Sequence, residues 1–227
     1  MEKPTALILD FGGVITKTLF ETHNLTEQEI GLAPGTLNWM GPFDPESDSL
    51  WRDMQAGMIT ERDYWLHRSR ETGALIGQDW TRMEDLLIAA RSKKPIEIIR
   101  PEAIVIISRV KAAGFQVAIL SNELDLFYGI EFRSKLPFLS DVDLVVDATY
   151  TKILKPDPAS YAFVTDGLDV SASACVYVDD QQRNITGAEA VGMKTVAFDV
   201  KQPGKSFQIA LAAFGLANNQ EENGDEA

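Results

Sequence analysis

The sequence predicts an α/β fold, with a parallel sheet at its core and a helical domain inserted into it. Short apolar runs alternate along the chain with segments bounded by helix-start and helix-stop residues, which is typical of a parallel sheet covered by helices. Between residues 16 and 94 this alternation is interrupted, and all four tryptophans fall in that interval. The length of 227 residues corresponds to about one and a half average domains, which leaves room for such an insertion.

Four apolar runs are expected to form the strands of the sheet. Each is short and aliphatic, as strands covered on both faces usually are. The runs are Ala6–Leu9, Val117–Leu120, Val176–Val178 and Thr195–Phe198.

Helices are expected between these strands, where start and stop residues bracket an apolar pattern. Pro101 begins one helix and Gly114 ends it. Residues 103–107 are rich in β-branched side chains, but the length and the two end signals favour a helix. A second helix begins at Asp157–Pro158, with Asp157 as its cap, and a third spans Asn184–Val191.

Residues 16–94 are expected to form the inserted helical domain, because they contain helix-capping patterns and no convincing strand. In a capping box, a threonine or serine precedes an acidic residue by three positions. The four tryptophans are expected to pack in the core of this domain. The candidate helix starts are Thr26–Glu29, Asp44–Pro45, Thr60–Asp63 and Thr81–Glu84.

The composition excludes several classes of partner. Lysine and arginine total 21 against 34 aspartates and glutamates, so the formal net charge is −13. Residues 218–227 hold four of these acids and no large apolar side chain, so we expect a disordered acidic tail. The rest of the chain is still strongly acidic, and we therefore expect no binding to nucleic acid or to anionic membranes, which attract cationic surfaces.

The single cysteine, Cys175, rules out an internal disulfide and a cysteine-rich zinc site. The apolar run near the N-terminus is too short for a signal peptide or a membrane span. We therefore expect a soluble cytoplasmic protein, either a monomer or a homodimer.

Polar residues follow three of the predicted strands. The first strand is followed by Asp10, the second by Ser121 and Asn122, and the third by Asp179 and Asp180. Because the carboxyl ends of parallel strands share one edge of the sheet, these groups are expected to meet in one crevice. Carboxylate oxygens suit Mg²⁺, and a divalent cation would relieve the mutual repulsion that raises the pKa values of clustered carboxylates.

With these residues, the sequence resembles the haloacid dehalogenase-like hydrolases, in the branch with a helical cap between the first two motifs. The four motifs occur in order as LILDFGGVIT, AILSNE, KILKPDPASY and VYVDDQQRNITGAEAVGM. The resemblance covers nearly the whole chain before the acidic tail. It implies a Rossmann-like core made of residues 1–15 and 95–217, with residues 16–94 as the cap.

The resemblance also implies a role for each motif residue. Asp10 would attack phosphorus and form an aspartyl-phosphate that water then hydrolyses. Ser121 and the amide of Asn122 would bind the phosphoryl oxygens of a small phosphorylated metabolite, with a sugar phosphate as one candidate. Lys155 would neutralise charge on the phosphoryl group and on Asp10. The implied Mg²⁺ ligands are Asp10, the main-chain carbonyl of Gly12, Asp179 (directly or through water) and Asp180.

One position departs from the family's pattern. Most phosphatases that the chain resembles carry a second aspartate two residues after the nucleophile, which acts as general acid and base, and here that position is Gly12. General acid–base catalysis contributes about 10²- to 10⁴-fold to a rate. His23, Glu123 and Asp125 are candidate replacements.

The glycine leaves two other functions open. The first is a metal-independent 2-haloacid dehalogenase, in which Asp10 attacks carbon; the pair Asp179–Asp180 counts against it, because dehalogenases that resemble this family lack that acidic motif. The second is a degenerate, non-catalytic binding protein. The presence of four motif residues counts against it, namely Asp10, Ser121, Lys155 and Asp180.

Overall fold

A computed structural model describes residues 2–91, 95–122 and 124–217 of the chain. It divides into two compact units. The α/β unit comprises Met1–Ile15, Arg100–Asn122 and Phe138–Ala227, and the helical unit comprises Thr16–Ile99 and Glu123–Pro137. The sequence resemblance implies that residues 95–99 and 123–137 belong to the core, whereas this division places both segments in the helical unit. The expected disorder of residues 218–227 lies outside the described residues.

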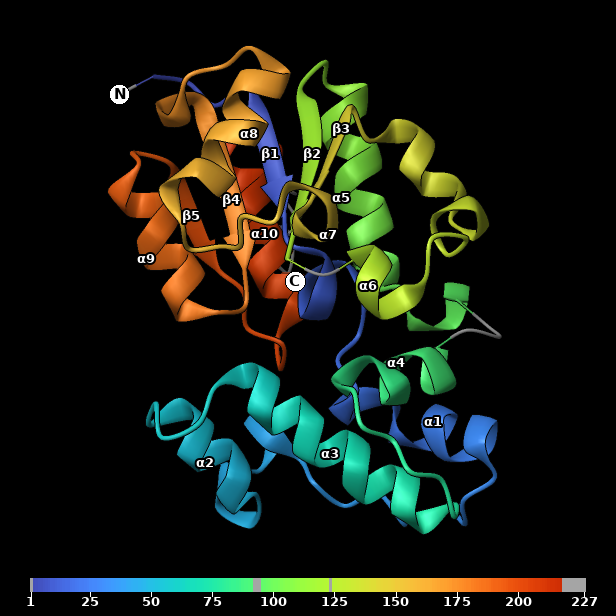
Figure 1. The fold of residues 1–227 in the computed structure, drawn as a ribbon. Coiled ribbons are helices and arrows are strands. Elements are labelled where there is room, and N and C mark those ends of the chain that lie inside the picture. The colour runs from blue at the N-terminus through green and yellow to red at the C-terminus, as the bar shows by residue number, and fades with distance from the viewer. Residues whose placement is uncertain (1, 92–94, 123, 218–227) are drawn as a thin grey trace, which may run out of the picture. The chain divides into compact units, whose positions relative to one another are not determined.

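Within the described residues, the α/β unit contains a five-stranded parallel sheet with the strand order β3-β2-β1-β4-β5 (Figure 1). The central strand is β1, and its Leu9 lies opposite Ile119 of β2 and Val178 of β4. The predicted α/β class with a Rossmann-like parallel sheet is therefore confirmed. The strands are β1 (Ala6–Leu9), β2 (Gln116–Ser121), β3 (Leu144–Asp147), β4 (Cys175–Asp179) and β5 (Lys194–Ala197).

Helices cover both faces of this sheet (Figure 1). Alternate residues of a strand point to opposite faces, so Ala6 and Ile8 of β1 pack with Tyr161 and Ile185, which lie on α8 and α9. On the other face α5 and α10 pack against each other. The helices of this unit are α5 (Pro101–Ala112), α7 (Ala148–Thr151), α8 (Pro158–Leu168), α9 (Gln182–Ala190) and α10 (Pro203–Ala213).

The helix starts in the α/β unit agree closely with the sequence. Helix α5 begins at Pro101, and α8 begins at Pro158, where the Asp157 carboxylate accepts a hydrogen bond from Ala159 N (2.9 Å). Helix α9 begins two residues before the predicted Asn184, which therefore lies in its first turn and is not its cap. None of the described helices is long and apolar enough to cross a membrane.

The helical unit has no strand among its described residues, only an isolated bridge between Thr16 and Ile99. The capping box at Thr60–Asp63 is confirmed, because each side chain accepts a hydrogen bond from the other residue's main-chain N–H. The helices are α1 (His23–Ile30), α2 (Ser49–Gln55), α3 (Glu61–Leu75), α4 (Met83–Arg91) and α6 (Leu124–Tyr128).

The other predicted starts in this unit are displaced. Thr26 lies inside α1, where its hydroxyl donates to the Thr22 carbonyl (3.1 Å), so the start predicted there is wrong. Asp44–Pro45 begins only a short 3₁₀ turn, and Asp48 caps α2 instead. Local capping patterns cannot tell a helix start from a threonine that bonds back to the preceding turn.

The core of the helical unit is aromatic, as expected from its tryptophans. The Phe20 ring lies at its centre, with ring centroids 5.4 Å from Trp39, 5.3 Å from Trp51 and 5.5 Å from Trp65. Trp80 packs at the edge of the same cluster.

Candidate active site

The candidate site lies within the α/β unit, at the carboxyl ends of β1, β2 and β4. Asp10 follows β1 directly, Ser121 is the last residue of β2 and Asp179 is the last residue of β4. The chain runs outward from β1 through β2 to β3 and then returns to the other side of β1 as β4. Ligands of open α/β sheets bind at such a switch point, beyond the strand ends.

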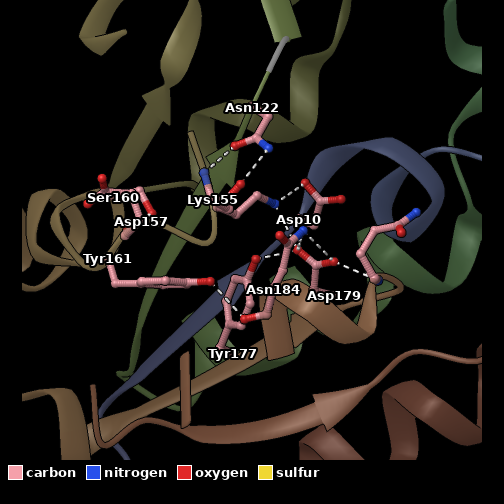
Figure 2. Close-up of polar contacts among 10 residues, drawn as sticks. Asp10, Asn122, Lys155, Asp157, Ser160, Tyr161, Tyr177, Asp179 and Asn184 are labelled. Carbon is pink, nitrogen blue, oxygen red and sulfur yellow. Dashed lines mark hydrogen bonds and ion pairs between the residues drawn. The ribbon is translucent and has the colours of Figure 1, made fainter. Parts of the chain in front are cut away.

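Lys155 lies at the centre of the cluster, as Figure 2 shows. Its Nζ lies 2.7 Å from Asp10 Oδ1 and 2.8 Å from Asp179 Oδ2, and its side chain is only 2% exposed. The Asn122 side chain fixes the Lys155 backbone, because Lys155 N donates to Asn122 Oδ1 (2.7 Å) and Asn122 Nδ2 donates to the Lys155 carbonyl (3.2 Å). A contact between Asn122 and a phosphoryl group would therefore come from its main-chain amide.

The Asp179 carboxylate is fully buried and surrounded by donors. Its Oδ1 accepts from Gln181 N (2.8 Å) and Asn184 Nδ2 (3.1 Å), and its Oδ2 accepts from Asn184 Nδ2 (3.1 Å), Lys155 Nζ and the Tyr177 hydroxyl. A carboxylate offers about four lone-pair sites. A metal could therefore bind Asp179 directly only by displacing one of these donors. The contact between Asp179 and Lys155, by contrast, is already present.

Asp180 is half-buried and lies against the loop that follows β1. Gly13 in that loop has φ +83°, and a Cβ there would lie 2.5 Å from Asp180 Oδ2. Only glycine satisfies both the backbone angle and this close approach. One oxygen from each of Asp10, Asp179 and Asp180 lies within 4.8 Å of the others. This all-oxygen donor set fits a hard divalent cation such as Mg²⁺.

Gly12 differs sharply from Gly13. It is exposed, with φ −74° and ψ 122°, and a Cβ at this position would have no described atom within 4 Å. Any residue can adopt these angles. Neither backbone geometry nor packing among the described residues therefore requires glycine at the position where most phosphatases that the sequence resembles carry their general acid.

The pKa of Asp10 is raised to about 7, because burial and, to a smaller extent, the neighbouring Asp179 raise it more than Lys155 lowers it. Burial acts to lower the pKa of Lys155, but the negative charges of Asp10 and Asp179 more than offset this effect. The pKa of the Lys155 ammonium is therefore held above its ordinary range. One cation thus faces two buried carboxylates, with Asp180 as a third close by. The cluster carries an excess of negative charge that a bound cation would balance.

Two of the candidate replacements for the missing acid lie in the helical unit. The His23 ring packs edge-on against Trp39, with ring centroids 4.2 Å apart, and burial lowers its pKa. The Asp125 carboxylate is in an ion pair with Arg133 Nε (2.7 Å). Glu123 lies outside the described residues.

Two residues of the cluster were not assigned to the site from the sequence. Asn184, predicted only as the start of the third helix, orders the acidic loop through its side-chain contact with Asp179. Tyr177 was interpreted only as part of an apolar strand. Because it precedes Asp179 by two residues in β4, strand periodicity places both on one face, and this was the available signal.

The profile of the haloacid dehalogenase-like hydrolases matches residues 4–192. (S)-2-haloacid dehalogenase 1 of Pseudomonas sp. (strain CBS-3) is 39% identical over 97 residues, which are 42% of this chain and 42% of the dehalogenase. The chain thus matches less than half the length of this relative. Sesquiterpene phosphatase astK of Aspergillus oryzae is 26% identical, over 83% of this chain and 86% of the phosphatase.

Solved structures share the fold at low sequence identity. The magnesium-bound HAD-hydrolase YfnB from Bacillus subtilis has a TM-score of 0.62 at 15% identity, over 86% of each chain. L-2-haloacid dehalogenase from Xanthobacter autotrophicus has a TM-score of 0.55 at 19% identity, over 86% of this chain and 77% of the dehalogenase. Together with the strand order, the four motifs and the clustered residues, the profile match shows that this chain belongs to the haloacid dehalogenase-like hydrolases.

Proposed function

We propose that this chain is a magnesium-dependent phosphatase that hydrolyses a small phosphate monoester. The observation that carries the proposal is the cluster of three carboxylates, with oxygens within 4.8 Å of one another, around one buried lysine. Such a cluster binds a cation readily, and a bound cation is what an anionic phosphoryl group needs beside a carboxylate nucleophile. A metal-free reaction would leave the same carboxylates repelling one another.

In this proposal, Asp10 attacks phosphorus, the ester oxygen departs, and water hydrolyses the resulting aspartyl-phosphate. Lys155 orients the attacking carboxylate and balances negative charge on the phosphoryl oxygens. Asp10, Asp180 and the Gly12 carbonyl would hold Mg²⁺, with Asp179 acting through Lys155. When bound, the ion supplies Lewis-acid stabilisation of the phosphoryl oxygens.

The relatives support phosphate ester chemistry but differ in substrate. Besides the sesquiterpene phosphatase, ribulose-1,5-bisphosphate 5-phosphatase of Halopiger xanaduensis is 31% identical over 48% of this chain. The substrate class we propose is therefore a small metabolite monoester, with a sugar phosphate as one candidate. With glycine at position 12, esters whose leaving oxygen needs little protonation should react fastest.

The second candidate is a 2-haloacid dehalogenase, and two observations favour it. A halide leaves without a proton, so Gly12 would be no defect, and one curated dehalogenase is 39% identical over 97 residues. In that reaction Asp10 would form its ester to carbon and need no cation. The three close carboxylates have no purpose there, which is why we place this function second.

One set of assays separates these functions. The purified protein is incubated with a panel of phosphate esters, with Mg²⁺ or with EDTA, and phosphate is measured; halide is measured after incubation with 2-chloropropionate. We expect phosphate release that EDTA abolishes and that Asp10→Asn abolishes. Halide release insensitive to EDTA would replace the proposal with dehalogenation, and a folded protein inactive in every assay would favour the binding function.

A further inference from the structure

Tyr177 is a fully buried residue of β4 that the proposed reaction does not use. Its hydroxyl donates to Asp179 Oδ2, the same oxygen that accepts from Lys155 Nζ (2.8 Å). A tyrosine phenol, whose ordinary pKa is about 10, is protonated at neutral pH, so the hydroxyl is a donor to the carboxylate. A tyrosine proton and a lysine ammonium thus share one carboxylate oxygen.

Tyr177 also contacts Lys155 through its ring. Lys155 Nζ lies 5.7 Å from the ring centroid, within the range of a cation–π contact. The Tyr161 ring makes a T-shaped contact with the same ring, with centroids 5.6 Å apart and planes at 86°, and this contact restricts the orientation of the Tyr177 ring. Figure 2 shows these side chains together at the end of the sheet.

This arrangement controls how Lys155 is shared between its two carboxylates. Lys155 Nζ is almost equidistant from Asp10 (2.7 Å) and Asp179 (2.8 Å). If Asp179 lost the tyrosine proton, its charge would be less compensated, and in a buried site the lysine would move toward it and away from Asp10. The hydroxyl therefore keeps the ammonium available to the nucleophile.

We propose that Tyr177 is a positioning residue that holds Lys155 against Asp10 by donating its hydroxyl proton to Asp179. Its effect on turnover rests on the proposed phosphatase function, whereas its effect on Lys155 does not. Phenylalanine at position 177 would fill nearly the same volume in the core, so Tyr177→Phe removes only the hydroxyl group.

The kinetic test uses Tyr177→Phe, with p-nitrophenyl phosphate as substrate. We expect kcat to fall about tenfold while KM stays near its starting value. In a Lys155→Met background the same change should cause no further loss of turnover, because Tyr177 acts through Lys155. The matched control is Tyr64→Phe, which also deletes a fully buried tyrosine hydroxyl bonded to a buried aspartate (2.9 Å), but in the helical unit.

The second test needs no catalytic activity. Protein with ¹³Cε-labelled lysine gives an NMR signal for Lys155, assigned by its loss in Lys155→Met. We expect Tyr177→Phe to shift this signal and Tyr64→Phe to leave it unchanged. If the signal stays in place, or if Tyr177→Phe slows turnover equally with and without Lys155, the positioning role is wrong. A shifted signal in a protein that hydrolyses no phosphate ester would uphold the positioning and contradict the proposed function.

Discussion

The α/β unit and the helical unit each contain a buried tyrosine and a buried aspartate that contact each other and a cation. In both, the tyrosine hydroxyl donates to the aspartate, the cation pairs with the same carboxylate, and the cation lies over the tyrosine ring. The two groups are Tyr177, Asp179 and Lys155 in the α/β unit and Tyr64, Asp48 and Arg68 in the helical unit.

The surroundings separate the two groups. Asp48 also accepts hydrogen bonds from Trp51 N (2.9 Å) and Gly41 N (3.2 Å), so it caps α2 and closes the preceding turn. Lys155 instead contacts a second carboxylate, Asp10, whose pKa burial raises to about 7. The same arrangement of a tyrosine, an aspartate and a cation is thus completed by main-chain donors in the helical unit, whereas in the α/β unit its cation also contacts the proposed nucleophile at a strand end.

The largest expected effect comes from removing each cation. Lys155→Met should lower kcat/KM for p-nitrophenyl phosphate about 10³-fold, because charge on the phosphoryl group loses its protein counter-ion. Arg68→Met should leave turnover unchanged and lower only the melting temperature. Steady-state kinetics on both variants tests this, and equal losses would mean that the two groups are not functionally different.

A second comparison removes the helical unit's carboxylate. Asp48→Ala should lower the free energy of unfolding by about 3 kcal/mol or more, because it removes the buried carboxylate that binds Arg68 and the Tyr64 hydroxyl and it uncaps α2. Urea denaturation measures this change. A loss within error of wild type would show that Arg68 finds another partner.

A somewhat smaller effect concerns the cation that the α/β unit should bind. Mg²⁺ at about 100 times its dissociation constant should stabilise the protein by about 2.7 kcal/mol. Asp180→Asn should remove most of this gain. Asp169→Asn, at an exposed residue with φ 55° that asparagine tolerates, is the matched control and should retain it. Thermal denaturation with and without Mg²⁺ checks the prediction, and stabilisation that survives Asp180→Asn would place the ion elsewhere.

The smallest expected effect restores an acid beside the nucleophile. Gly12→Asp has room for its side chain, and it should raise kcat about tenfold for alkyl phosphates, with less change for p-nitrophenyl phosphate. Rates on the two substrate types measure the difference. An equal or lower rate on both would mean that another group already transfers the proton.

The strands could be predicted because burial on both faces leaves an unbroken apolar run. The sequence does not predict β3, because its apolar run Leu144–Val146 is only three residues long and lies between Asp143 and Asp147, with Leu144 and Val145 half-buried. The sequence also does not predict that residues 123–137 belong to the helical unit. This segment follows β2 in the chain, and only tertiary packing assigns it to that unit.

The candidate site was more predictable than the fold's details. Parallel strand ends must converge, so Asp10, Ser121 and Asp179 could be brought together without a structure. The sequence does not predict which side chains of the cluster bind one another. That Asp179 is saturated by donors, and that Tyr177 is one of them, depends on side-chain directions.

The adjacent glycines of the loop after β1 also bear on how the chain can change under selection. Gly13 is locked by its positive φ and by Asp180, while Gly12 stands open beside it. A saturation library should therefore tolerate almost no side chain at position 13 and many at position 12. The backbone of this loop can thus stay constant at position 13 while position 12, two residues after Asp10, varies. A single substitution at position 12 could then introduce a proton-transfer group.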